Sequence, residues 1–204
     1  MENTISHIVH RDDEASKMGM WIFIFTELLL FGGLFLVYAV FRAKYSEDFH
    51  IAAMELNAFV GTANTVILLI SSMTVAMAIT AIQKGDKGLS IKLLAVTLLL
   101  ATFFMINKYF EWSGKIHHGL YPGSEVMLGL NRGQLLFFGL YYATTGLHAL
   151  HVFIGMAILA VMLFRIKSGK ITQDNFVHLE NGGLYWHLVD LIWIFLFPLL
   201  YLIT

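Results

Sequence analysis

The chain has 204 residues, of which 58% are hydrophobic and only 13% are charged, with no cysteine and a net charge of −1. A soluble domain has about 45–50% hydrophobic and about 25% charged residues, so this composition argues against a soluble globular domain and excludes a disordered chain. It also excludes thiolate chemistry and a nucleic-acid-binding surface. The composition therefore indicates an integral membrane protein.

The chain opens with a polar segment, residues 1–17, which precedes a hydrophobic run at Met18–Phe41. The segment lacks the basic start and the small-residue cleavage site of a secretory signal. The run is also too long for a signal core, so we expect it to stay as a membrane-spanning helix. Glu27 lies about nine residues into this run, which is about 13 Å along a helix and close to the bilayer midplane.

Four further hydrophobic runs follow, at Asn57–Ile82, Ile91–Trp112, Gln134–Phe164 and Leu184–Thr204. Each is long enough to cross a hydrocarbon core of about 30 Å as a helix of about 20 residues. Continuous runs also exclude a β-barrel, whose strands alternate in polarity over about ten residues. The sequence predicts an all-α polytopic membrane bundle of five transmembrane helices, forming one domain over residues 18–204.

The basic residues of the connections predict the orientation, because cytoplasmic loops carry more Lys and Arg than outer loops. One side of the predicted bundle has Arg11, Lys17, Lys84, Lys87, Lys92, Arg165, Lys167 and Lys170, and the other has Arg42, Lys44, Lys108, Lys115 and Arg132. This asymmetry places the N-terminus, with residues 1–17, in the cytoplasm and the C-terminus outside.

Two acidic residues lie deep in the predicted spans, Glu27 and Asp190, whereas Lys108 and Glu111 lie near a span end where long side chains reach the headgroups. A charged residue at a helix centre costs about 2.5–3.5 kcal/mol, and each central Leu, Ile, Phe or Val offsets about 0.3–0.6 kcal/mol. The first span therefore inserts despite Glu27. Its apolar neighbours favour a neutral carboxyl group, either as a proton-exchanging acid or as an acid hydrogen-bonded to another helix.

Asp190 lies three residues after His187, so both share one face near the start of the last span, and Glu180 lies two turns earlier on the same side. An acid–histidine pair at the membrane edge can relay protons or bind a metal. The simpler alternative, which we favour, is a local hydrogen-bonded pair that fixes this end of the helix against its neighbours.

His148 and His151 share one face of the fourth span. Two imidazoles on one face suggest metal or haem ligation. A haem held between helices needs a histidine from each of two helices, however, and the remaining cluster, His117–His118, falls in a loop. Buried hydrogen bonding across helices is therefore the favoured role.

Five segments in order along the chain carry a resemblance to a known family. They are Phe25-Thr26-Glu27 before Leu-Leu-Leu-Phe-Gly-Gly, Asn64-Thr65 with Leu68-Leu69 and Ser71-Ser72, Glu111-Trp112, Thr145–Val152, and Glu180 with Tyr185–Trp193. The last two read T-G-x-H-x-x-H-V and E-x-x-x-x-Y-W-H-x-x-D-x-x-W. From about Trp21 to Thr204 the chain resembles subunit III of the haem–copper terminal oxidases, in its five-helix bacterial form. Trp112 stands where that family more usually has Tyr.

The resemblance implies roles for the polar residues and partners for the chain. Glu27 matches the family's carbodiimide-reactive, proton-related glutamate. The candidates for a structural role or for a lipid or proton network are Glu111, His148, His151, Glu180, His187 and Asp190. The resemblance implies no catalytic residue, metal, haem or copper in this chain. It implies catalytic subunit I and subunit II as partners that carry haem and copper, together with bound phospholipid and a place in the bacterial cytoplasmic membrane, and it leaves membership of a respiratory supercomplex open.

The function expected from this resemblance is that of a non-catalytic subunit III of an aerobic terminal oxidase, foremost a cytochrome c oxidase. Such a subunit stabilises the catalytic subunit and supports proton uptake during oxygen reduction. Subunit III of a quinol oxidase or of a related nitric oxide reductase is the alternative within the family. Two alternative functions lie outside the family. One is a proton-coupled carrier that uses Glu27 and Asp190, and the other is a membrane metal enzyme that uses His148, His151 and His187.

Overall fold

The computed structural model describes the backbone of residues 2–203 and the side chains of residues 13–203. Within these residues the chain forms seven helices and no strand. Five are long: α1 (Glu2–Lys44), α3 (Ala58–Gln83), α4 (Lys87–His117), α6 (Arg132–Lys167) and α7 (Val177–Tyr201). All five are long and apolar enough to cross a membrane, which confirms the predicted fold class.

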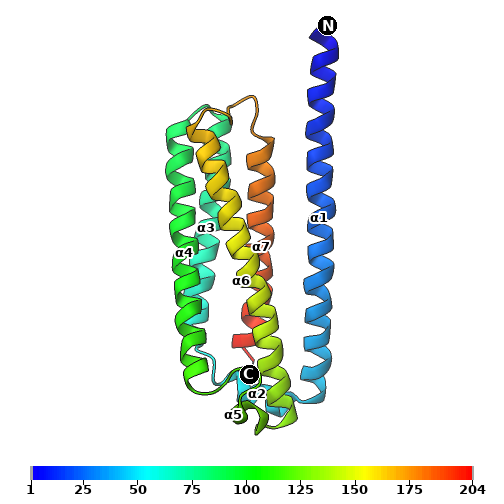
Figure 1. The fold of residues 1–204 in the computed structure, drawn as a ribbon, viewed down its shortest axis with the longest axis vertical. Coiled ribbons are helices and arrows are strands. Elements are labelled where there is room, and N and C mark those ends of the chain that lie inside the picture. The colour runs from blue at the N-terminus through cyan, green and yellow to red at the C-terminus, as the bar shows by residue number, and fades with distance from the viewer. Residues whose placement is uncertain (1, 204) are drawn as a thin grey trace.

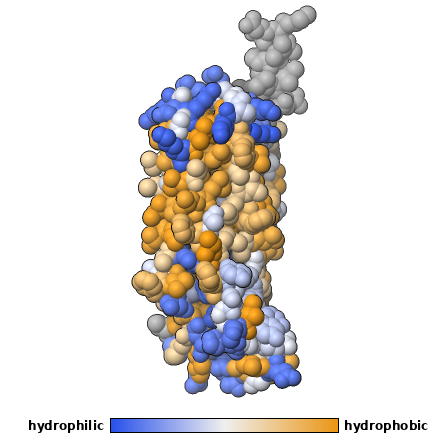
Figure 2. Space-filling view, turned by 60° about the vertical axis from the view of Figure 1, so that its left-hand side comes forward, coloured by the Kyte–Doolittle hydropathy of each residue, from blue (hydrophilic) through white to orange (hydrophobic). Residues whose placement is uncertain are grey.

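The long helices run side by side along one axis, with α3 and α4 at one flank, α1 at the other, and α6 and α7 between them (Figure 1). α1 begins at one end of the bundle, and α7 ends at the other, where the short helices α2 (Ser46–Ala53) and α5 (Glu125–Leu128) lie. A hydrophobic band separates two hydrophilic ends (Figure 2). Such a band is the surface that a hydrocarbon core requires.

α7 is the central helix of the bundle, because it packs against α1, α3 and α6. It is also the most buried of the five long helices, whereas α1 is the least buried. α1 is fixed near the far end of α7 by the hydroxyl of Tyr38, which donates to the carbonyl of Leu199. This carbonyl lies in the last turn of the helix, where no later N–H is in place to bond it.

α1 and α7 extend beyond their predicted runs at the end of the bundle where α1 begins, and polar side chains of the two extensions bond to each other. α7 begins at Val177 instead of Leu184, and its first turns are tied to α1. Glu180 forms an ion pair with Lys17 at 2.9 Å, and the Nδ2 of Asn181 donates to the Oγ of Ser16 at 2.9 Å. α1 likewise continues through residues 2–17, of which the side chains up to residue 12 lie outside the described part.

α2 is fixed to the start of α6 by a carboxylate. The backbone N–H of Gly133 donates to the Oδ2 of Asp48 at 3.2 Å, which satisfies one of the free N–H groups that every helix start presents. A Cβ atom at position 133 would lie 2.8 Å from the Cγ of Asp48, so only glycine leaves room for this contact.

Candidate functional site

Glu27 and His151 form an ion-paired or hydrogen-bonded contact between α1 and α6. The Oε2 of Glu27 lies 2.9 Å from the Nε2 of His151, and their side chains are 14% and 9% exposed. Phe31 meets the imidazole edge-on at 5.3 Å, and Tyr185 stacks on it at 6.4 Å. The contact is therefore enclosed on the protein side by aromatic rings.

The second ring nitrogen of His151 defines how many protons this pair holds. Its Nδ1 lies 2.8 Å from the carbonyl oxygen of Leu147. A carbonyl oxygen only accepts, so Nδ1 carries a hydrogen. Glu27 and Nε2 then share one further proton, which resides either on the carboxyl group or on the imidazole. Both forms are neutral overall, and they suit a low-dielectric position in which a lone charge is costly.

His148 points away from this pair although it lies one turn from His151. It is fully buried, with the edge of Phe104 at 5.7 Å and the indole of Trp193 at 5.1 Å between ring centroids. Neither of its ring nitrogens has a hydrogen-bond partner among the described residues. The two histidines therefore do not point to one common ligand site. Across residues 13–203 no three His, Cys, Asp or Glu side chains are grouped to hold a metal ion.

A second polar group, here called the Lys108 cluster, consists of Lys108, Glu111, Tyr141 and Tyr201. The Nζ of Lys108 donates to the hydroxyl of Tyr201 at 2.6 Å and lies 3.3 Å from the Oε2 of Glu111. Both tyrosine hydroxyls donate to the Oε1 of Glu111 at 2.5 Å. The ammonium group also lies over the ring of Trp193, 4.9 Å from its centroid. The cluster joins α4, α6 and α7.

The expectation that Lys108 and Glu111 reach the headgroups from a helix end is wrong. Lys108 is only 3% exposed. α4 continues to His117, so Lys108 lies about 13 Å before the end of its helix. Lys115 is buried as well, and it donates to the backbone carbonyl of Glu55 at 2.9 Å. The signal in the sequence was the position of Pro122, the first proline after the hydrophobic run, which follows Trp112 by ten residues.

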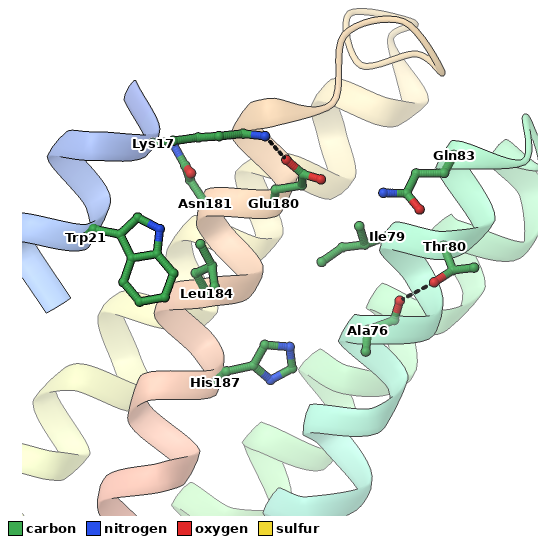
Figure 3. Close-up of a pocket in the computed structure, with 10 residues that line it drawn as sticks. All are labelled: Lys17, Trp21, Ala76, Ile79, Thr80, Gln83, Glu180, Asn181, Leu184 and His187. Atoms are coloured by element: carbon green, nitrogen blue, oxygen red, sulfur yellow. Dashed lines mark hydrogen bonds and ion pairs between the residues drawn. The ribbon is translucent and has the colours of Figure 1, made fainter. Parts of the chain in front are cut away.

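A third feature is a pocket of about 440 Å³ between α1, α3 and α7, here called the His187 pocket (Figure 3). Lys17 and Glu180 form their ion pair at the polar end of this pocket, while the imidazole of His187 points into the space between α7 and α3. The ten residues that line it are Lys17, Trp21, Ala76, Ile79, Thr80, Gln83, Glu180, Asn181, Leu184 and His187.

His187 and Asp190 are not hydrogen-bonded to each other, contrary to the local pair expected from their spacing. The Nδ1 of His187 lies 2.6 Å from the Oγ of Ser72 on α3. Asp190 is 3% exposed, and neither of its carboxyl oxygens has a hydrogen-bond partner within the described residues. Ser72 was singled out in the sequence only as part of a motif, because its partner lies on another helix.

These features define a class of protein: a multi-pass membrane bundle whose buried polar residues join helices in pairs and small clusters. The comparisons with known sequences identify the family. A profile of the family "Cytochrome c oxidase subunit III" matches residues 6–204. The chain belongs to this family and is thus a subunit of a haem–copper oxidase, which confirms the resemblance found in the sequence.

Individual relatives agree over nearly the full length. The chain is 31% identical over 196 residues to cytochrome c oxidase subunit 3 of Thermostichus vulcanus, covering 96% of this chain and 90% of that protein. It is 31% identical over 197 residues to the probable cytochrome c oxidase subunit 3 of Nocardia farcinica, covering 97% and 92%. It is also 30% identical over 193 residues to the heme-copper oxidase subunit I+III of Aeropyrum pernix, covering 92% of this chain and 22% of that protein.

Proposed function

We propose that this chain is a non-catalytic subunit of a bacterial cytochrome c oxidase, and that it supports proton uptake through a proton held between Glu27 and His151. The observation that carries the proposal is the 2.9 Å contact between these two side chains, with Nδ1 of His151 already committed to a carbonyl group. A pair that shares one proton deep in a bundle can hold that proton without a net charge.

The partners of the chain would be catalytic subunit I and subunit II, which would carry the haem and copper and translocate protons. The Aeropyrum pernix relative supports contact with subunit I, because its name, subunit I+III, places both units in one chain. α1 supports it as well, since this helix uses one side against α6 and α7 and exposes large hydrophobic side chains elsewhere. Those side chains would face a partner subunit or bound phospholipid.

The chain would lie in the bacterial cytoplasmic membrane with its N-terminus in the cytoplasm. The asymmetry of Lys and Arg supports this orientation. Lys108 and Lys115, which the sequence assigned to the outer side, turn into the bundle and leave fewer basic groups at that end. The His187 pocket, between the first half of α1 and the first turns of α7, would then open toward the cytoplasm.

The proposal is tested with Glu27→Gln in the whole oxidase complex. A glutamine at this position can donate an N–H to the Nε2 of His151, which keeps the contact but removes the shared, transferable proton. We expect the complex to assemble, to lose labelling by a hydrophobic carbodiimide, and to slow in proton uptake over repeated turnovers. Glu125→Gln, an exposed position on α5, is the matched control and should behave as the wild type. Normal proton uptake by Glu27→Gln over many turnovers would refute the role of the pair.

A further inference from the structure

We propose that Asp190 is an internal proton-binding site that exchanges its proton with water in the His187 pocket, through the imidazole of His187 and the hydroxyl of Ser72. This inference deepens the proton-uptake role proposed above and adds a second site to it. That site lies on α7 and does not involve Glu27.

The first step of the argument is the surroundings of Asp190. The side chain is 3% exposed, and both carboxyl oxygens are without a hydrogen-bond partner among the described residues. Buried carboxylates are ordinarily paired with a cation or bonded to donors, because an unpaired charge in a low-dielectric interior is costly. Asp190 therefore suits a neutral carboxylic acid, and it can exchange its proton only along a route that returns one and leaves no lasting charge.

The second step is the connection from Asp190 to the pocket. Asp190 lies three residues after His187, so both share one face of α7, and Ser72 of α3 contacts this face. The Oγ of the same serine lies 2.6 Å from the Nδ1 of His187. His187 is half-buried, and its ring lines the pocket (Figure 3). A single hydroxyl group thus lies between an imidazole at the pocket and an acid behind it.

The proton balance follows from this arrangement. When motion of the side chains brings the hydroxyl of Ser72 within hydrogen-bonding distance of Asp190, Nδ1–H of neutral His187 gives its proton to the Oγ of Ser72, while the hydroxyl proton of Ser72 passes to the carboxylate of Asp190. Nε2 takes a replacement proton from water in the pocket. The imidazole ends neutral with its hydrogen on the other nitrogen, and release along the same route in reverse restores the first tautomer. No net charge remains on His187 or Ser72 at either end of the exchange.

Few other charges bear on this route. α3 has no acidic, basic or histidine side chain over its whole length. At the polar end of the pocket, Lys17 and Glu180 are paired with each other. The other titratable groups that face α7 are Tyr38 and Glu27 of α1, Lys108 and Glu111 of α4, and Tyr141, His148 and His151 of α6. Of these, Glu27 is paired with His151 and Lys108 with Glu111. His187 is therefore the titratable group between Asp190 and the pocket.

The test is infrared spectroscopy of the resting, purified oxidase complex after transfer to D₂O, with aspartate labelled at its carboxyl carbon. We expect a carboxylic acid band from aspartate that Asp190→Asn lacks and that shifts as hydrogen is exchanged for deuterium. His187→Gln can still bond Ser72, but an amide cannot pass a proton between two ring nitrogens. Exchange should then slow about 10²-fold, the lower range of what a positioned proton carrier supplies. The matched control is His117→Gln, an exposed histidine near the opposite end of the bundle, which should exchange at the wild-type rate.

The proposal is overturned if Asp190→Asn keeps every aspartic acid band, or if His187→Gln exchanges as fast as the wild type. If Asp190→Asn does not assemble, the proposal is overturned when the labelled wild type shows no exchangeable aspartic acid band. Ser72→Ala replaces His187→Gln if the latter does not assemble, and it should slow exchange in the same way. Because the complex is at rest, failure here leaves the turnover test of Glu27 unaffected, and failure of that test leaves this one unaffected.

Discussion

Replacing Lys108 by methionine should destabilise the subunit by about 3 kcal/mol, the lower end of the range for breaking a buried ion pair. Methionine keeps the length of the buried stem but removes the ammonium group that lies 3.3 Å from Glu111 and 4.9 Å from the centre of the Trp193 ring. Glu111 would retain its two tyrosine donors at 2.5 Å. Hydrogen bonds to a charged acceptor contribute about 1.5–3 kcal/mol each. Because the two tyrosine donors would still stabilise the Glu111 carboxylate, we expect the loss of stability in Lys108→Met to lie at the lower end of the range for a broken buried ion pair.

The free energy of unfolding should be measured by titration of the purified complex with denaturing detergent. Lys108→Met combined with Glu111→Gln should come within about 1 kcal/mol of the wild type, because it removes both charges and leaves an oxygen acceptor for the tyrosines. Lys92→Met, at an exposed position on the same helix, should change stability by less than about 0.5 kcal/mol. If Lys108→Met costs no more than Lys92→Met, the buried pair does not stabilise the bundle as inferred.

Two further predictions concern α6 and use the same titration. Gly133→Ala should destabilise the subunit by about 1–3 kcal/mol, because the added Cβ would press on Asp48. Gly139→Ala is the control and should not destabilise it, because a Cβ there would meet nothing within 4 Å. Equal effects of the two substitutions would contradict the packing argument. His151→Leu should destabilise the subunit more than His148→Leu, because the ring nitrogens of His151 have two hydrogen-bond partners and those of His148 have none in the described chain. Neither substitution should shift the haem spectrum of the complex. A lost haem band with intact assembly would contradict the second prediction.

The sequence predicts the membrane spans well because the thickness of the bilayer sets their length. It predicts their ends less well because the ends depend on contacts between helices. α7 begins at Val177 because Glu180 and Asn181 have partners on α1, and the hydrophobic run alone starts later. Hydropathy contains no information about a partner that lies more than a hundred residues away in the chain.

The same limit applies to the polar residues. Glu27 and His151 each stand out in the sequence as polar groups at the depth of the hydrocarbon core, and side chains of this kind commonly pair with each other. Their spacing along the chain does not identify the pair, because α1 and α6 meet only through the tertiary fold. Lys108 was misplaced for a related reason. Its burial depends on Tyr201 of α7, which accepts a hydrogen bond from Lys108, and on Tyr141 of α6, which donates to its partner Glu111.

Satisfaction of hydrogen bonds distinguishes the Lys108 cluster from Asp190. In the Lys108 cluster every charged atom has a partner, and a fully satisfied buried network makes a structure rigid. Asp190 has no hydrogen-bond partner among the described residues, and it lies behind a histidine that lines a pocket. Without a hydrogen bond, the carboxyl group of Asp190 adds little to the stability of the bundle beyond what a neutral side chain of the same shape would add. For that reason Asp190→Asn should leave the stability of the bundle nearly unchanged while it abolishes the exchangeable proton.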